Sequence, residues 1–239
     1  GDTPGFGVKS AQFGLVGNNN TEDAGGEIGT VSGPTDTSAG SGFENHVTWS
    51  GTYGGFFDIS HQYLFNNDYE RIDILTTFNA LVDLSELKFV RAIDPDPDVN
   101  THGSFDTINS RGADGVPAED FVNSQGPQTG LTLGLYSNSS VPHNTGISLA
   151  WSTDPDFYLA GNDDGNGDNV IGLAFNIGTL LAGDSVVLSY SYVMGETLAS
   201  VDLPDNPVVG VPVPGTLFLF GLGMLGILSA RRRIVSVAY

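Results

Sequence analysis

Short runs of alternating apolar and polar residues recur between residues 43 and 193, separated by glycine, asparagine and proline. In residues 131–135 and 147–151 every second side chain is apolar. A period of two places the apolar side chains on one buried face of a strand. Further short runs rich in β-branched and aromatic residues occupy 46–49, 55–59, 62–65, 72–78, 87–93, 170–177 and 185–193. The pattern predicts an all-β fold, an antiparallel β-sandwich of either jelly-roll or immunoglobulin-like type.

Composition divides the chain into four parts. Residues 1–42 are rich in Gly, Asn and Thr, and form either an N-terminal arm, which can add a strand to a neighbour's sheet, or edge strands. Residues 43–203 are expected to form the sandwich, with a helical turn at 79–87. Residues 204–214 are a proline-rich linker. Residues 215–239 are expected to form a hydrophobic helix with a basic C-terminal end.

The charge of the chain is strongly asymmetric. All 28 acidic residues lie before residue 211, together with 5 of the 8 basic ones, so this part carries a net charge of 5 − 28 = −23. Such a surface repels nucleic acid and attracts divalent cations, and we expect no nucleic-acid partner. The chain has no cysteine, which excludes disulfides, thiol catalysis and Cys-ligated metals.

The C-terminal tail is the longest apolar segment. Residues 214–230 form an uninterrupted run of 17 apolar and small residues, closed by Arg231, Arg232 and Arg233. As a helix, this run is about 25 Å long, which is enough to span a bilayer at least transiently, with the arginines on the cytoplasmic side. The alternative is a buried core helix. The large apolar side chains expected to contact another copy are Leu217, Phe218, Phe220, Leu222, Leu225 and Ile227.

This tail resembles the C-terminal sorting signal of bacterial PEP-CTERM proteins. The resemblance rests on Val211, Pro212, Val213 and Pro214, on the glycine-studded apolar run, and on the arginine cluster that follows it. Val213 stands where the family usually has Glu. The resemblance implies an exported surface or matrix protein that is handed to a membrane transpeptidase-like enzyme, an exosortase. It covers about an eighth of the chain.

Two acidic loops are candidate Ca²⁺ sites. In residues 94–100 the carboxylates of Asp94, Asp96 and Asp98 alternate with prolines and are expected to project on one side of a stiff, extended segment. In residues 162–171, Asp164, Asn166 and Asp168 match positions one, three and five of a calcium loop, whereas positions six and twelve depart from it. Segments similar to 94–100 and 147–156 recur in exported PEP-CTERM sandwiches, which suggests that the loops belong together. The alternative is that Asp, Asn and Gly only form tight turns here.

No catalytic arrangement is visible in the sequence, and we predict that the chain is not an enzyme. It contains no G-x-S-x-G, no H-E-x-x-H and no phosphate loop, and its four histidines show no ligand spacing. Aromatic residues that could stack on sugar rings, but that more often lie in a core, are Trp49, Tyr53, Tyr63, Tyr136, Trp151 and Tyr158.

Three functions therefore compete. The first is a non-catalytic structural protein of the cell surface or extracellular matrix, a homo-oligomer or polymer joined through the C-terminal helix and the N-terminal arm. The second is a calcium-dependent module that binds an extracellular polysaccharide or mediates adhesion. The third, a secreted polysaccharide hydrolase, is the least favoured, because no nucleophile and base can be paired.

Overall fold

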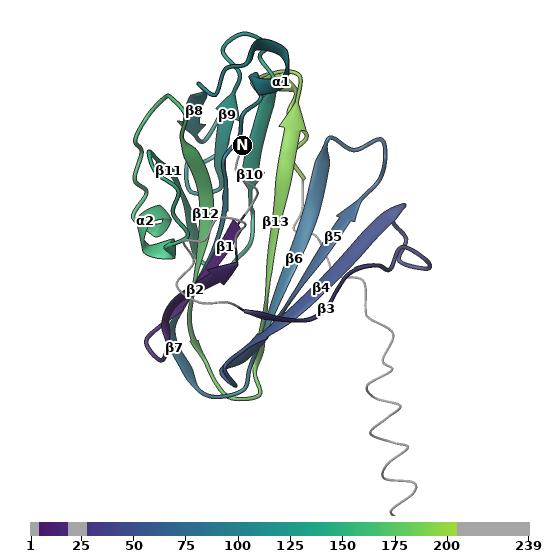
Figure 1. Ribbon diagram of the computed structural model, residues 1–239, viewed down its shortest axis with the longest axis vertical. Coiled ribbons are helices and arrows are strands. Elements are labelled where there is room, and N and C mark those ends of the chain that lie inside the picture. Colours follow the sequence, from purple (N-terminus) through teal and green to yellow (C-terminus); the bar gives the residue numbers. More distant parts are fainter. Residues whose placement is uncertain (1–4, 19–27, 205–239) are drawn as a thin grey trace, which may run out of the picture. The chain divides into compact units, whose positions relative to one another are not determined.

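Two antiparallel β-sheets make up most of the chain that the structure describes (Figure 1). The computed structural model describes residues 5–18 and 28–204. The predicted all-β, antiparallel, sandwich-like fold is confirmed. The hydrophobic helix expected at 215–239 lies outside the described residues.

The five-stranded sheet has the strand order β11-β12-β7-β1-β2, and the eight-stranded sheet has the order β3-β4-β5-β6-β13-β10-β9-β8. The strands of the first sheet are β1 (Gly5–Ser10), β2 (Gly14–Asn18), β7 (Leu84–Ile93), β11 (His143–Ser148) and β12 (Val170–Leu180). Those of the second are β3 (Gly29–Asp36), β4 (Asn45–Tyr53), β5 (Phe57–Phe65), β6 (Arg71–Ala80), β8 (Ile108–Arg111), β9 (Phe121–Gln125), β10 (Thr132–Tyr136) and β13 (Ser185–Gly195). Three short helices join them: α1 (Val99–His102), α2 (Pro155–Leu159) and the 3₁₀ helix η1 (Leu198–Ser200).

The main core lies between the two sheets. It contains fully buried aromatic residues from both, including Phe89 and Phe175 of the five-stranded sheet and Phe57, Phe78 and Tyr190 of the eight-stranded sheet. Their rings contact one another at centroid distances of 5.5 to 6.4 Å, mostly in tilted or edge-on orientations. Burial of such large side chains is the main favourable term in the folding of this domain.

The helical turn expected at 79–87 is wrong. The segment is the end of β6, a tight connection and the beginning of β7. Leu84 and Leu87 are spaced three apart, as on a helix, and both are fully buried. They share a face of a strand because Glu86 between them has a left-handed conformation (φ 52°) and the pairing with β12 is irregular there. A bulge of this kind adds one residue to the alternation.

The strand expected at 147–151 is also partly wrong. β11 ends at Ser148, and Leu149 is 73% exposed, whereas Ile147 is fully buried. The chain then turns into α2, whose Tyr158 packs on Val90 and Ala174 on the outer face of the five-stranded sheet. Asp154 caps this helix by accepting a hydrogen bond from the backbone N–H of Asp156, with Pro155 at the first helical position.

Residues 1–42 contribute strands to both sheets. β1 lies inside the five-stranded sheet, between β7 and β2, and β2 forms the edge of that sheet. β3 forms an edge of the eight-stranded sheet, and all its residues are exposed. The N-terminal region therefore supplies one edge strand to each sheet.

A cluster of buried polar side chains lies inside the main core, between β5, β6, β7 and β13. Nε of Arg91 donates to the Tyr192 hydroxyl at 2.5 Å. His61 is 1% exposed, stacks on Trp49 at 5.2 Å and hydrogen-bonds the Thr76 hydroxyl at 2.8 Å. Burial, reinforced by the nearby Arg91 guanidinium, holds the pKa of His61 well below its ordinary value. The imidazole is therefore neutral in the folded protein at pH 7.

The chain leaves β13 through η1 and is then tied to the outer face of the eight-stranded sheet. Nη1 of Arg71 lies 2.5 Å from a carboxylate oxygen of Asp202, and Nε of the same arginine lies 3.4 Å from Asp73. Asp73 is buried and also accepts a hydrogen bond from the Ser191 hydroxyl at 2.6 Å. Residues 201–204 are half-buried although they have no regular secondary structure.

Candidate functional site

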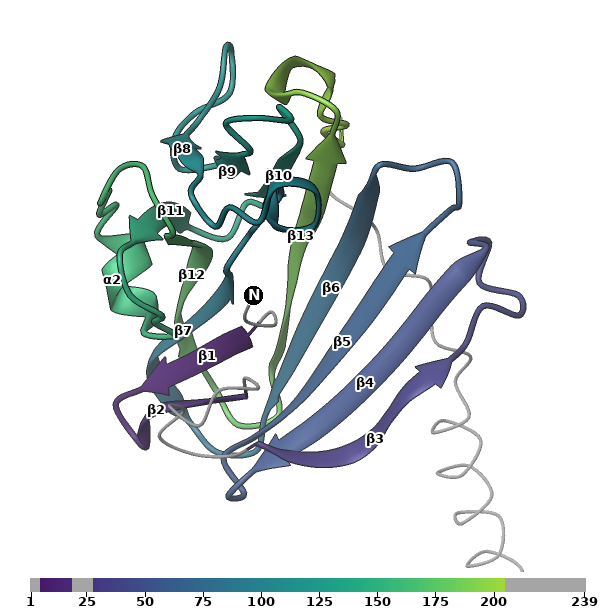
Figure 2. The same cartoon turned by 45° about the horizontal axis from the view of Figure 1, so that its top comes forward.

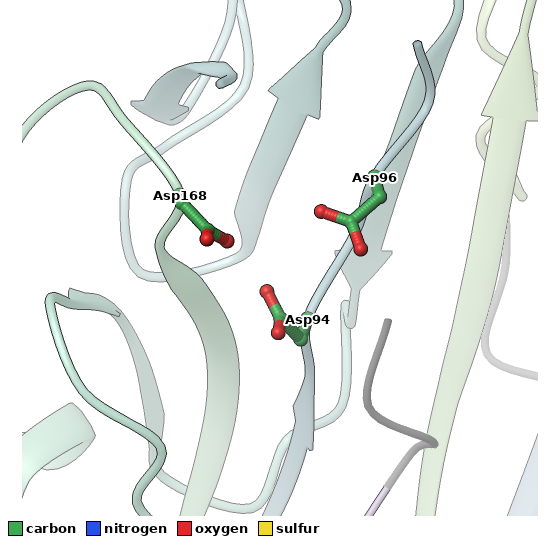
Figure 3. A group of neighbouring side chains, drawn as sticks. All are labelled: Asp94, Asp96 and Asp168. Carbon is green, nitrogen blue, oxygen red and sulfur yellow. The ribbon is translucent and has the colours of Figure 1, made fainter. Parts of the chain in front are cut away.

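Three of the six predicted metal ligands come together at one end of the five-stranded sheet. Asp94 and Asp96 follow β7, and Asp168 precedes β12, the strand that pairs with β7 with Ile93 opposite Ile171. Each of the three carboxylates offers an oxygen within 4.8 Å of the others. Figure 3 shows the three side chains pointing toward a common space. The pairing of β7 with β12 thus joins the two acidic loops.

The electrostatics of this aspartate cluster (Asp94, Asp96 and Asp168) favour a cation. Asp94 and Asp96 are half-buried, both carboxylate oxygens of Asp96 are inaccessible to solvent, and Asp168 is exposed. Carboxylates this close repel one another, and a cation or a shared proton between them relieves the repulsion. Calcium prefers carboxylate and carbonyl oxygens and accepts irregular geometry. The three residues therefore fit part of a Ca²⁺ coordination shell, which water would complete.

Asp98, the third predicted ligand of the first loop, lies outside this cluster. Its backbone is already helical (φ −94°, ψ −4°) at the beginning of α1, so the extended alternation of the loop ends there. The buried carboxylate accepts hydrogen bonds from the backbone N–H groups of Gln128 (2.8 Å) and Thr129 (3.2 Å) and from the Thr129 hydroxyl. Burial alone would raise the pKa of Asp98, but these hydrogen bonds outweigh it and hold the pKa below its ordinary value.

The other two predicted ligands of the second loop also bind backbone groups. Asp164 accepts a hydrogen bond from the backbone N–H of Leu149 at 2.8 Å, and Asn166 accepts one from the backbone N–H of Asn109 at 2.9 Å. Asn109, which no sequence motif singles out, is buried and donates to the carbonyl of Gly165 at 3.0 Å. These contacts fix the loop against β8 and the end of β11, and so place Asp168.

The aromatic residues considered for sugar stacking belong mainly to the cores. Tyr158 is fully buried beside α2, with Trp151 packed on the same cluster. Trp49, Tyr53 and Tyr63 are half-buried and pack against the main core. Tyr136 is half-buried and its ring lies 6.4 Å from that of the buried Phe121. None of the six rings is therefore fully exposed.

One histidine faces a carboxylate. Nε2 of His143 lies 3.1 Å from Asp120, and Nδ1 of the same ring lies 2.7 Å from the carbonyl oxygen of Val141. No hydroxyl group of a described residue is hydrogen-bonded to this imidazole. Of the other histidines, His46 and His61 are buried and His102 is exposed.

The sorting-motif residues Val211, Pro212, Val213, Pro214 and Arg231–Arg233 lie outside the described residues. So do the apolar residues proposed for assembly, Leu217, Phe218, Phe220, Leu222, Leu225 and Ile227. Within residues 5–18 and 28–204, no helix is long and apolar enough to cross a membrane.

A comparison with known protein families finds a match at the C-terminal end of the chain. The model of the PEP-CTERM protein-sorting motif matches residues 210–233, which confirms the resemblance found in the sequence. No curated protein matches the chain. A motif of this type marks an exported protein that an exosortase processes at the membrane.

Proposed function

From the PEP-CTERM motif, we propose that the chain is a non-catalytic structural protein of the cell surface or extracellular matrix that assembles with copies of itself. The motif at residues 210–233 is the observation that carries this proposal, because it indicates export and sorting at the membrane. The two hydrophobic cores can hold the β-rich fold together by packing, so the lack of cysteine does not argue against a role outside the cell.

A non-catalytic role is supported by the groups around the best acid–base pair. His143 and Asp120 are adjacent, as in a catalytic dyad, but the second nitrogen of His143 faces the carbonyl of Val141 rather than a nucleophile. His61 does have a hydroxyl partner, Thr76, but it is enclosed in the main core, where no substrate can reach it. Neither arrangement supplies a nucleophile that is open to solvent.

Self-assembly is supported at both ends of the chain. The sequence of the tail contains large apolar side chains, such as Leu217, Phe220 and Leu225, that would pack against another copy if the tail is helical. The N-terminal region provides the edge strands β2 and β3, and an edge strand has unpaired backbone groups that can accept a strand from a neighbour.

Removal of the tail tests this proposal. We expect the purified full-length chain to form regular polymers by negative-stain microscopy, and a chain truncated after Gly210 to remain monomeric by light scattering. In cells, the truncated chain should also be lost from the surface. A matched control replaces residues 211–213 with Gly and Ser and keeps the apolar run 214–230, so its assembly in vitro should persist. Normal polymers from the truncated chain would overturn assembly through the tail.

The aspartate cluster favours a second candidate, a calcium-dependent adhesion module. If Asp94, Asp96 and Asp168 hold Ca²⁺, the ion joins the exit of β7 to the entry of β12 and stiffens the loops at that end of the molecule. An adhesive surface built on these loops would then depend on calcium, as extracellular modules with weak calcium sites do.

Calcium should raise the melting temperature of the protein. At a concentration 100-fold above Kd, we expect Tm to rise by about 5–10 °C relative to NaCl of equal ionic strength. The double variant Asp94→Asn/Asp96→Asn should lose this increment, whereas Asp58→Asn/Asp184→Asn, which changes two carboxylates elsewhere, should keep it. An equal Tm in CaCl₂ and NaCl would count against a calcium site.

A further inference from the structure

A polar cleft lies at the end of the eight-stranded sheet, between the β3–β4 and β5–β6 connections. Figure 2 shows these two connections at the same end of β4 and β5. The register agrees, because Asn45 at the beginning of β4 pairs with Phe65 at the end of β5. The cleft has a volume of about 700 Å³ and is lined by Gly42, Phe43, Glu44, Asn66, Asn67 and Asp68.

Hydrogen bonds between the two connections fix the walls of this cleft. The backbone N–H of Glu44 donates to Oδ1 of Asn66 at 3.0 Å, and the backbone N–H of Asn67 donates to Oε2 of Glu44 at 2.7 Å. In addition, Nδ2 of Asn45 donates to Oδ1 of Asn67 at 3.0 Å. The side chains of Glu44, Asn66 and Asn67 are therefore already oriented, which lowers the entropy cost of binding a ligand.

The same hydrogen bonds determine which atoms remain for a ligand. Asn66 and Asn67 both use their carbonyl oxygens, so each keeps an amide NH₂ with two donors. Glu44 uses Oε2 and keeps Oε1, and the carboxylate of Asp68 accepts no hydrogen bond from another described residue. The cleft thus presents amide donors beside carboxylate acceptors, with the half-buried ring of Phe43 as an apolar wall.

This combination matches the chemistry of a sugar ring. Each hydroxyl of a sugar is both a donor and an acceptor, so two vicinal hydroxyls can donate to a carboxylate while accepting from an amide. The C–H face of the ring is apolar and can pack on an aromatic side chain. A mostly open cleft with a few fixed polar groups suits a chain of sugar residues better than a compact, apolar ligand.

The charge of the cleft selects against anionic sugars. Two of its six lining residues are carboxylates and none is basic. The nearest arginine in the sequence, Arg71, is occupied by Asp73 and Asp202. A uronic acid or sulfated sugar would place a third negative charge beside Glu44 and Asp68, which is unfavourable at close range.

We propose that this cleft binds a neutral polysaccharide through two vicinal hydroxyls of one sugar residue. The inference goes beyond the proposed structural role, because it gives the protein a ligand at the cell surface. It does not depend on polymer formation, so its failure and that of the assembly proposal are distinguishable.

Calorimetric titration of the full-length protein with hexasaccharides tests this site. The probes are maltohexaose, cellohexaose, xylohexaose and mannohexaose, with hexagalacturonate as the anionic counterpart. We expect at least one neutral hexasaccharide to bind and hexagalacturonate not to bind. Phe43→Ala should weaken binding by about tenfold or more through loss of the ring. Asn67→Asp should do the same, because it keeps Oδ1 for Asn45 and removes the two amide donors.

Matched controls change the same residue types elsewhere. Phe105→Ala removes an exposed ring outside the cleft, and Asn79→Asp changes an exposed amide near the end of β6; both should bind like the wild type. Failure of all four neutral probes at millimolar concentration would overturn the proposal. So would equal weakening by the control variants, tighter binding of hexagalacturonate, or a loss of binding in Asp94→Asn/Asp96→Asn but not in Asn67→Asp, which would place the sugar at the aspartate cluster.

Discussion

At the scale of single residues, burial changes the pKa of a histidine in the main core. His61 is enclosed by Trp49, Thr76 and the Arg91 guanidinium, and its pKa is held well below the ordinary value. The unfolded chain, in contrast, takes up a proton on this side chain below about pH 6.5. The unfolded state therefore binds more protons than the folded state in mildly acidic solution, and stability decreases as the pH falls.

This difference predicts a pH dependence that one substitution removes. Between pH 7 and 5.5, the free energy of unfolding of the wild type should fall by up to about 1.4 kcal/mol per pH unit below pH 6.5. His61→Gln should be less stable at neutral pH but should lack most of this slope. The exposed His102 provides the control, since His102→Gln should leave the slope unchanged. Urea unfolding at several pH values measures it, and an undiminished slope in His61→Gln would contradict the assignment.

At the scale of elements, one ion cluster secures the chain where it leaves the sandwich. Arg71 bridges the buried Asp73 of β6 and the more exposed Asp202, which follows η1. The loss of the two contacts should have different effects on stability. The side chain of Asp73 is 4% exposed, so its charge must be compensated by protein groups. The side chain of Asp202 is 40% exposed, so water can solvate its charge.

Two variants separate these contacts. Arg71→Gln should lower the free energy of unfolding by about 1–2 kcal/mol, because it leaves the buried Asp73 with the Ser191 hydroxyl alone. Asp202→Asn should change global stability little but should speed amide hydrogen exchange in residues 198–204. Asp184→Asn, a change in the exposed β12–β13 turn, should do neither. Unchanged exchange in Asp202→Asn would show that the ion pair does not secure this segment.

At the scale of the whole molecule, the sequence predicts the sheets better than their irregularities. Strands with clear alternation or dense aromatic content, such as β6 and β13, are found where the pattern indicates them. The bulge at Glu86 is different, because it depends on a left-handed backbone that β12 stabilises from across the sheet. The three-residue spacing of Leu84 and Leu87 does not reveal that β12 lies beside them.

The candidate metal site has the same limit. The acidic loops are visible in the sequence, but their grouping depends on which strands are neighbours, and that brings Asp168 beside Asp94 and Asp96. Asp98 is outside the group because its hydrogen-bond donors belong to a turn 30 residues further along the chain. The sequence signal shows which side chains can bind a cation, whereas the topology selects those that converge.

The basic side chains before the tail are paired within the chain, and this affects how copies of the protein repel one another. Of the basic residues before the tail, Lys9, Lys88 and Arg71 are ion-paired within the chain, and Arg91 and Arg111 donate to neutral groups inside it. With a formal net charge of −20, two copies repel each other over about 30 Å at 10 mM salt but only about 10 Å at 0.1 M. We therefore expect any association between copies to strengthen as the salt concentration rises from 10 mM to 0.1 M, which light scattering can measure.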